Sequence, residues 1–254
     1  MNTNGISGLI GLAVTLLFAF PLPQARSATF SLNPSADAFV DGNLANNNYG
    51  GAGALSVAAP GLAQGEFQSV VQFNFAAAKS SFDTQFGVGQ WTIQSVSLQL
   101  TAAAPNNGIF NASAAGQFGI SWMQNDSWTE GTGTPAAPTL TGITFSTINS
   151  FVSGADESLG TFSFNGATSG AFSYDLSLTP LFSADLLSGG TVGLRLFATD
   201  TSVSYLSDSR NFGTASARPL LTITAVPEPS TLALATLALC LFGCRLHRNN
   251  PSRL

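Results

Sequence analysis

Histidine and cysteine are missing from most of this chain. The 254 residues include one histidine, His247, and two cysteines, Cys240 and Cys244, all in or just after the last apolar segment. Their absence elsewhere excludes Ser-His-Asp hydrolysis, thiol catalysis and the usual zinc sites from the rest of the chain. It also excludes a disulfide there, so we expect the fold to depend on burial of apolar side chains, including many of the 20 phenylalanines.

Charged residues are also scarce. They make up 8% of the chain, whereas an ordinary soluble domain carries about 25%. Between residues 29 and 226 there are four basic and twelve acidic residues, which gives a formal charge of −8. Because nucleic-acid binding requires clustered cations, we expect no nucleic-acid partner.

The first 27 residues have the order of an export signal. An apolar run at residues 6–20 is followed by two prolines and then by Ala-Arg-Ser-Ala at 25–28. Small residues three positions and one position before a cut suit signal cleavage. We therefore expect an N-terminal signal helix and cleavage after Ser27. A permanent N-terminal anchor is the alternative, which the short run and the prolines disfavour.

Residues 226–254 form a second candidate targeting segment. Val226-Pro227-Glu228-Pro229 precedes an apolar run at 230–244, and Arg245 and Arg248 follow that run. The prolines disfavour helix and sheet pairing, so we expect an extended segment before the membrane. The run is 15 residues long, shorter than the ~20 of a comfortable span. It predicts a short C-terminal transmembrane helix that inserts transiently in an inner membrane, with the basic end in the cytoplasm.

This arrangement resembles the PEP-CTERM sorting signal of Gram-negative bacteria, in which Pro-Glu-Pro precedes a short hydrophobic helix and an Arg-rich end. The resemblance implies that an exosortase, a membrane protease-transferase, recognises Val226 to Pro229 and removes the tail. Release to the cell surface or attachment there would follow, often in organisms that make exopolysaccharide. Glu228 would then be a recognition residue and not a catalyst. A plain C-terminal anchor is the alternative.

Apolar residues between the two ends recur with a period of two, which predicts β-strands. The clearest strands are expected over 66–76, 91–101, 192–196 and 221–223, and shorter ones over 36–40, 117–123, 159–164 and 171–176. A change of parity near Gln94-Ser95 predicts a β-bulge, and Asn165-Gly166 predicts a hairpin between the last two strands. No stretch longer than one turn keeps a helical period. We therefore expect residues 28–225 to form one all-β domain, an antiparallel β-sandwich or jelly roll.

Three places in this domain are similar to the DNRLRE-type domain. They are Ala-Asp-Ala-Phe-Val-Asp at 36–41 with Asn-Asn-Asn-Tyr-Gly at 46–50, Asp-Ser-Trp-Thr-Glu-Gly at 126–131, and Asp-Ser-Arg at 208–210 with Arg-Pro-Leu-Leu-Thr-Ile at 218–223. The resemblance implies a β-sandwich module of exported and cell-surface bacterial proteins that is associated with carbohydrate binding.

Asp126 and Glu130 are the strongest candidates for chemistry, because Trp122 and Trp128 lie beside them in the sequence. Aromatic faces stack on sugar rings, so these four residues form our candidate carbohydrate site. Four residues along a strand span about 13 Å, whereas a retaining glycosidase needs carboxyl groups about 5 Å apart, so catalysis would require a bend. The alternative is that Trp128 fills the core and that the two acids cap loops.

Oxygen-bearing side chains are concentrated near the start of the domain, at Asp37, Asp41, Asn43 and Asn46 to Asn48. They suit Ca²⁺ as ligands, although their spacing fits no known calcium loop. An Asn-rich turn whose side chains cap their own backbone is the alternative. We expect Arg210 to pair with Asp208 or with another acid across the sheet.

The sequence thus predicts an exported, non-enzymatic protein of the cell surface or extracellular matrix, structural or carbohydrate-binding. Its expected partners are an exosortase and an exopolysaccharide, and Ca²⁺ is the one cofactor considered. The rival hypothesis is a secreted polysaccharide-active enzyme that uses Asp126 or Glu130.

Overall fold

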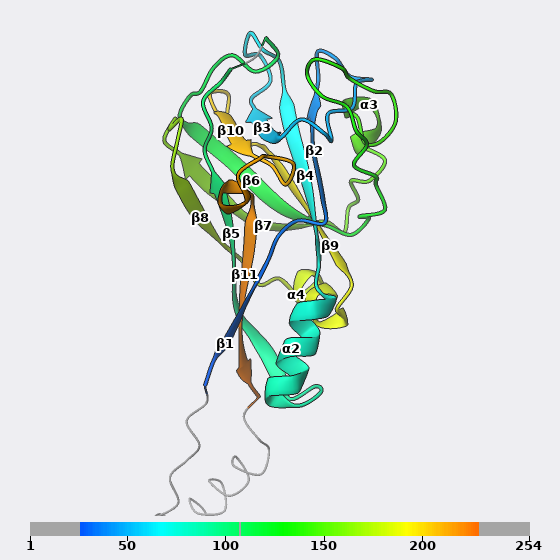
Figure 1. The fold of residues 1–254 in the computed structure, drawn as a ribbon, viewed down its shortest axis with the longest axis vertical. Helices are drawn as coiled ribbons and strands as arrows, with labels where there is room; N and C mark the ends of the chain where they lie inside the picture. The colour runs from blue at the N-terminus through cyan, green and yellow to red at the C-terminus, as the bar shows by residue number, and fades with distance from the viewer. Residues whose placement is uncertain (1–25, 107, 229–254) are drawn as a thin grey trace, which may run out of the picture.

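The computed structural model describes residues 26–106 and 108–228 (Figure 1). The predicted signal helix at residues 1–25, Pro229, the predicted C-terminal transmembrane helix, Arg245 and Arg248 lie outside the described residues. Within the described part of the chain, no helix is long and apolar enough to cross a membrane.

Two antiparallel sheets make up most of the domain, which confirms the all-β prediction and is consistent with a β-sandwich. One sheet contains β1 (Ala28–Leu32), β5 (Trp91–Thr101), β8 (Ala171–Leu176) and β11 (Leu220–Pro227). The other contains β2 (Ala36–Asp41), β3 (Ala54–Ala58), β4 (Phe67–Asn74), β6 (Gly116–Met123), β7 (Glu157–Phe164), β9 (Thr191–Ala198) and β10 (Ser204–Asp208). The strand orders are β1-β11-β5-β8 and β10-β3-β4-β9-β6-β7, with β2 paired to β4.

Apolar side chains on the facing sides of the two sheets form the main core. Val71 and Phe73 of β4 belong to this buried cluster, as do Leu98 of β5 and Leu221 of β11. The predicted bulge in β5 is confirmed, because Ser95 pairs with Thr224 and Ile93 pairs with Ala225, which leaves Gln94 as the extra residue. The bulge lets apolar residues of both parities in β5 face the core.

The opposite face of the seven-stranded sheet is also covered. Val70, next to Val71 in β4, packs on that face with Met123, Trp128 and Ile148. Ile148 belongs to the short helix α3 (Phe145–Ile148), which lies near β2 and β4 (Figure 1). The loops after β6 therefore act as a second layer over this part of the sheet.

The prediction that no helix occurs between the two ends is wrong. The structure contains α2 (Ala76–Phe86) and α4 (Pro180–Ser188). Each helix buries a single pair of side chains spaced four apart, Ala78 with Phe82 and Phe182 with Leu186. One such pair is too short a repeat to give a clear periodic signal. The sequence features typical of a helix at α4 are Pro180 in its first turn and Gly189 just after its end. Gly189 adopts the left-handed conformation that often ends helices.

The predicted hairpin at Asn165-Gly166 is also wrong. β7 pairs with β6 in one sheet, whereas β8 pairs with β5 in the other, so residues 165–170 cross between the sheets. Gly166 has a positive φ of 81°, but no described non-glycine residue has one, and a type I′ turn requires positive φ at both central residues. Asn165 instead accepts a hydrogen bond from the backbone N–H of Ala167 at 3.0 Å.

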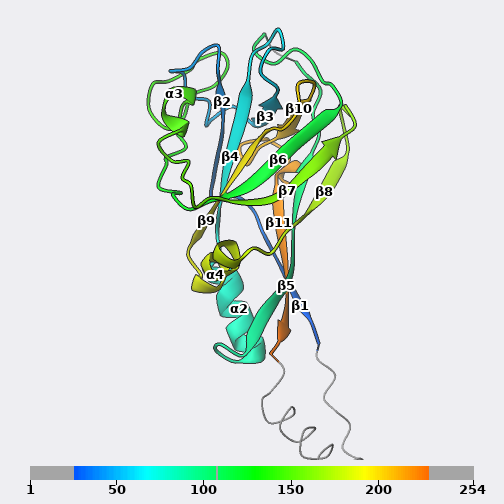
Figure 2. The same ribbon diagram turned by 180° about the vertical axis from the view of Figure 1, so that it is seen from behind.

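Both ends of the described chain leave the domain at one pole. β1 and β11 are antiparallel, and Ala28 pairs with Ala225. The helices α2 and α4 lie toward the same end, while α3 and several long loops lie toward the other end (Figures 1 and 2). We call the start of β1, the end of β11 and α2 the terminal pole.

Candidate functional site

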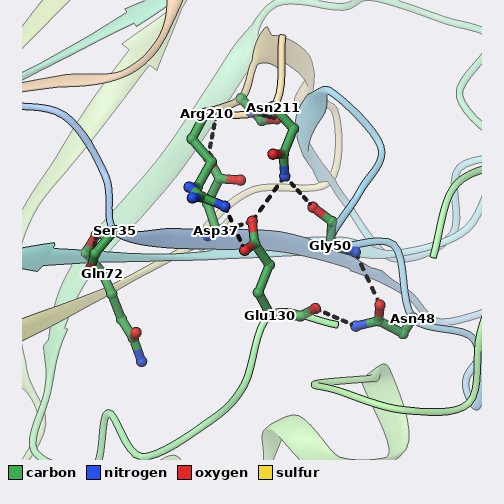
Figure 3. Close-up of polar contacts among 9 residues, drawn as sticks. Ser35, Asp37, Asn48, Gly50, Gln72, Glu130, Arg210 and Asn211 are labelled. Atoms are coloured by element: carbon green, nitrogen blue, oxygen red, sulfur yellow. Dashed lines mark hydrogen bonds and ion pairs between the residues drawn. The ribbon is translucent and has the colours of Figure 1, made fainter. Parts of the chain in front are cut away.

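The three segments singled out in the sequence meet around one ion pair (Figure 3). The Arg210 Nη1 atom lies 2.7 Å from Glu130 Oε2, and the Arg210 backbone N–H donates to Asp37 Oδ2 at 2.7 Å. The backbone N–H of Asp37 donates to Glu130 Oε1 at 3.3 Å. One strand residue, one residue from the loop after β6 and one from the loop after β10 thus hold each other in place.

Two asparagines extend this arrangement. Asn211 Nδ2 donates to Glu130 Oε1 at 2.9 Å and to the Gly50 carbonyl at 2.7 Å. Asn48 Nδ2 donates to the carbonyls of Glu130 at 2.7 Å and Ile143 at 2.8 Å. We call Asp37, Asn48, Glu130, Arg210 and Asn211 the clamp.

Glycine is required where the clamp's loops touch. A Cβ atom at Gly50 would overlap the Glu130 carbonyl, and one at Gly133 would overlap the Asn48 carbonyl. Asn48 Oδ1 accepts hydrogen bonds from the backbone N–H groups of Gly50 at 3.2 Å and Gly133 at 3.1 Å. The Asn-rich loop and the Gly- and Thr-rich stretch after Glu130 are therefore complementary parts of one structure.

Asp37 is the most perturbed acid of the clamp. Its side chain is fully buried, and Oδ1 accepts no hydrogen bond from the described residues. The pKa of Asp37 is raised to about 7, chiefly by burial and in addition by the negative charge of Glu130, whereas the Arg210 backbone N–H and the Arg210 charge lower it. This carboxyl group is accordingly partly protonated near neutral pH.

The two tryptophans of the predicted carbohydrate site are both in the interior. Trp122 is 6% exposed and Trp128 is 4% exposed. Trp122 Nε1 donates to Asp185 Oδ2 at 2.7 Å, and Trp128 packs in the cluster beneath α3. Neither ring presents a face to solvent, so the arrangement matches the alternative in which Trp128 fills the core.

The two candidate carboxylates have different surroundings. Glu130 is held by Arg210 and Asn211 in the clamp, whereas Asp126 lies near Asp185 of α4. Burial, followed by the charge of Asp185, raises the pKa of Asp126, and burial raises that of Asp185. The acid beside Asp126 is therefore Asp185 and not Glu130. Sequence reasoning missed Asp185 because its position depends on α4.

Several of the oxygen atoms proposed for Ca²⁺ accept hydrogen bonds from the protein itself. Asp41 Oδ1 accepts from the backbone N–H groups of Asn43 at 2.8 Å and Leu44 at 3.4 Å, and Asn46 Oδ1 accepts from Ser146 Oγ at 2.8 Å. Over residues 26–106 and 108–228, no group of three or more His, Cys, Asp and Glu side chains could hold a metal ion. Asp41 caps its own turn, as in the alternative prediction, whereas Asn46 and Asn48 bond to residues of the loops after β6.

No family model matches this chain, and no curated protein matches it.

The described part of the predicted sorting motif belongs to a sheet. Val226 pairs with Thr92 and Pro227 with Trp91, and the backbone N–H of Glu228 donates to the Gln90 carbonyl at 2.9 Å. The prediction that Pro227 keeps this segment out of the sheet is wrong. Since β1 pairs only as far as Ala225, the side of β11 opposite β5 is open at Pro227, where a missing N–H costs no ladder hydrogen bond.

Proposed function

We propose that this chain is an exported, non-enzymatic β-sandwich protein of the bacterial cell surface or extracellular matrix, sorted through Val226, Pro227, Glu228 and Pro229. An exosortase is its processing partner. The signal helix directs export, and the apolar tail inserts transiently in the inner membrane with Arg245 and Arg248 in the cytoplasm.

The observation that carries the proposal is the pairing of Ala28 with Ala225. Because the two chain ends leave the same pole, an export signal and a membrane tail would both attach there, and the long loops at the opposite end would face away from the membrane (Figure 1). Such a domain can be tethered at one end and keep the rest of its surface free for contacts.

The interactions of the acidic residues support a structural role. Glu130 is bound to Arg210 at 2.7 Å, and Asp37 receives the Arg210 backbone N–H at 2.7 Å. Both carboxylates tie separate loops together, so their chemistry is used to hold the fold. Contact with exopolysaccharide is the binding function that we propose for the surface.

The sorting part is tested by Glu228→Ala in the native host. We expect the wild-type surface or secreted form to lack residues 230–254 by mass spectrometry, and the variant to remain longer and membrane-bound. Asp175→Ala, at an exposed position of β8, is the control and should be processed as wild type. Equal size and release of Glu228→Ala and wild type would contradict sorting by this motif.

The rival proposal is a polysaccharide-active enzyme. The observation that favours it is the pair of acids with raised pKa values, Asp126 and Asp185. Glu130→Gln is a poor test, since it also removes the ion pair with Arg210. Release of reducing ends from a polysaccharide, abolished by Asp126→Asn in a normally folded protein, would favour the enzyme. We expect no such release from the wild-type chain.

A further inference from the structure

A cleft of about 390 Å³ lies beside the ends of β3 and β10. Such a volume falls within the range of small-molecule sites. Its wall is made largely of small and apolar side chains and contains one acidic residue. The lining residues include Ala54, Ala104, Leu206, Asp208 and Phe212.

Asp208 points into this cleft. It lies two residues after Leu206 in β10, so the two side chains share one face of the sheet, and both line the cleft. Tyr205, of the opposite parity, belongs instead to the main core. The cross-strand partner of Asp208 is Ala54, whose small side chain also lines the cleft and takes up little of its space.

The carboxylate of Asp208 lacks a protein partner. The residue is 7% exposed, yet within residues 26–106 and 108–228 no side chain or backbone N–H donates to it, and Arg210 two residues later is bound to Glu130. Neither carboxylate oxygen of Asp208 is among the fully buried unpartnered atoms of the described residues, so both reach the solvent in the cleft. Hydroxyl groups of a ligand could replace that water and donate to the carboxylate.

The exposed ring of Phe212 and the negative charge of the domain favour a neutral ligand with an apolar face. Phe212 lines the cleft and is 37% exposed, so its ring is available to pack on the apolar face of a sugar ring. No basic side chain lines the cleft, and the domain carries a formal charge of −8 over residues 29–226. Anionic ligands are therefore disfavoured.

We infer that the Asp208 cleft binds a neutral sugar unit of a polysaccharide, with the carboxylate accepting hydrogen bonds from ring hydroxyls and Phe212 packing against the ring. The inference rests on the proposed contact with exopolysaccharide and assigns a site to it. This site differs from the predicted set of Trp122, Asp126, Trp128 and Glu130.

The titration of Asp208 gives a second readout. Burial raises its pKa to about 6, and it is the one titratable group among the residues that line the cleft. Two charged groups contact the lining residues from outside the cleft: Glu130 accepts from Asn211, and Arg218 Nε donates to the Phe212 carbonyl at 3.0 Å. Because an ionised carboxylate is the stronger acceptor, sugar binding should strengthen between pH 5 and 7.

The experiment is saturation-transfer NMR on the full chain in a micelle of a detergent without sugar groups. The probes are the methyl glycosides of glucose, galactose and mannose, with glucuronate and Ca²⁺ as separate probes. We expect binding of at least one neutral glycoside and none of glucuronate. Asp208→Asn should weaken binding by about tenfold and remove its pH dependence.

Two variants complete the design. Ala104→Trp, at an exposed position on the cleft wall, should block binding by filling the space, even if the loss at Asp208→Asn were attributed to altered folding. Asp175→Asn, an exposed acid of β8, should bind as wild type.

Failure of every neutral glycoside, binding of Ca²⁺ alone, or wild-type binding by both Asp208→Asn and Ala104→Trp would overturn the inference. The processing of Glu228→Ala is independent of these measurements, so the sorting proposal could stand while this site is rejected.

Discussion

The terminal pole and the clamp both join segments that are distant in the sequence, but they do so with different chemistry. At the terminal pole, Phe82 of α2 contacts Trp91 with ring centroids 5.0 Å apart and Phe30 of β1 at 6.4 Å. In the clamp, the joining contacts are an ion pair and side-chain hydrogen bonds among loops. Regular elements can share an apolar interface, whereas loops carry unpaired backbone groups that need polar partners.

The largest effect is expected at the terminal pole. Phe82→Ala should lower the free energy of unfolding by about 3–5 kcal/mol, because it leaves a cavity between buried aromatic rings. Urea unfolding measures the change. Phe86→Ala, at a half-buried position of the same helix, should cost clearly less. Equal losses for the two variants would mean that α2 is not held by the Phe82 contacts.

The next effect is expected in the clamp. Arg210→Ala removes the partner of the partly buried Glu130 and leaves that carboxylate beside buried Asp37, which should cost about 1–3 kcal/mol. The matched control is Lys79→Ala, which removes the Lys79–Asp83 pair, 2.6 Å long and as exposed as the clamp pair. It should cost less than about 0.5 kcal/mol, because that pair lies within one helix and joins no separate segments. A loss at Arg210 no larger than that at Lys79 would show that the clamp does not stabilise the fold.

The pH dependence of stability is expected to come from the clamp, because the terminal pole is joined by apolar contacts that do not titrate. Asp37 has a folded pKa of about 7, raised from 3.8, so the folded state binds more protons between these values. Its contribution to stability is therefore complete below about pH 4 and is lost as pH rises toward 7. Thermal melts should show this decline in wild type and a flatter profile in Asp37→Asn. Asp208→Asn serves for comparison, because the raised pKa of Asp208 has the same sign.

The smallest effect is expected at exposed apolar side chains. Val88, in the turn after α2, and Leu140, in the loop that pairs with Asn48 through Thr139, are each 78% exposed. Val88→Asp and Leu140→Asp should each change the free energy of unfolding by less than about 0.5 kcal/mol. A larger loss at Leu140 alone would mean that the clamp's loops depend on apolar contacts as well.

Strands could be predicted from the sequence where one face is buried, because alternation is then visible. The expected strand at 91–101 and its bulge match β5. β1, β3 and β10 were missed. β3 is buried along most of its length and β10 throughout, so neither shows alternation, and β1 has one buried residue, Leu32, at its end. The hairpin at Asn165-Gly166 was wrong because turn residues do not specify which strands pair.

The candidate site could be predicted in its residues but not in its geometry. The segments around Asp37, Glu130 and Arg210 were all singled out, yet sequence alone did not place them in contact, because their contacts depend on the pairing of β2 with β4 and on the loops after β6 and β10. For the two tryptophans, the sequence did not predict whether the rings are buried. Large aromatic side chains occur both in cores and on binding surfaces, and in this fold both rings are in the interior.

The hydrogen bond from Glu228 to Gln90 bears on the order of steps in the processing that we propose. A membrane protease that binds Val226 and Pro227 as an extended substrate would compete with β5, which already pairs with both residues. The end of β11 would therefore have to separate from β5 before any cut. After cleavage, the end of β11 could pair with β5 again. The processed protein would then have the same sheet as before the cut.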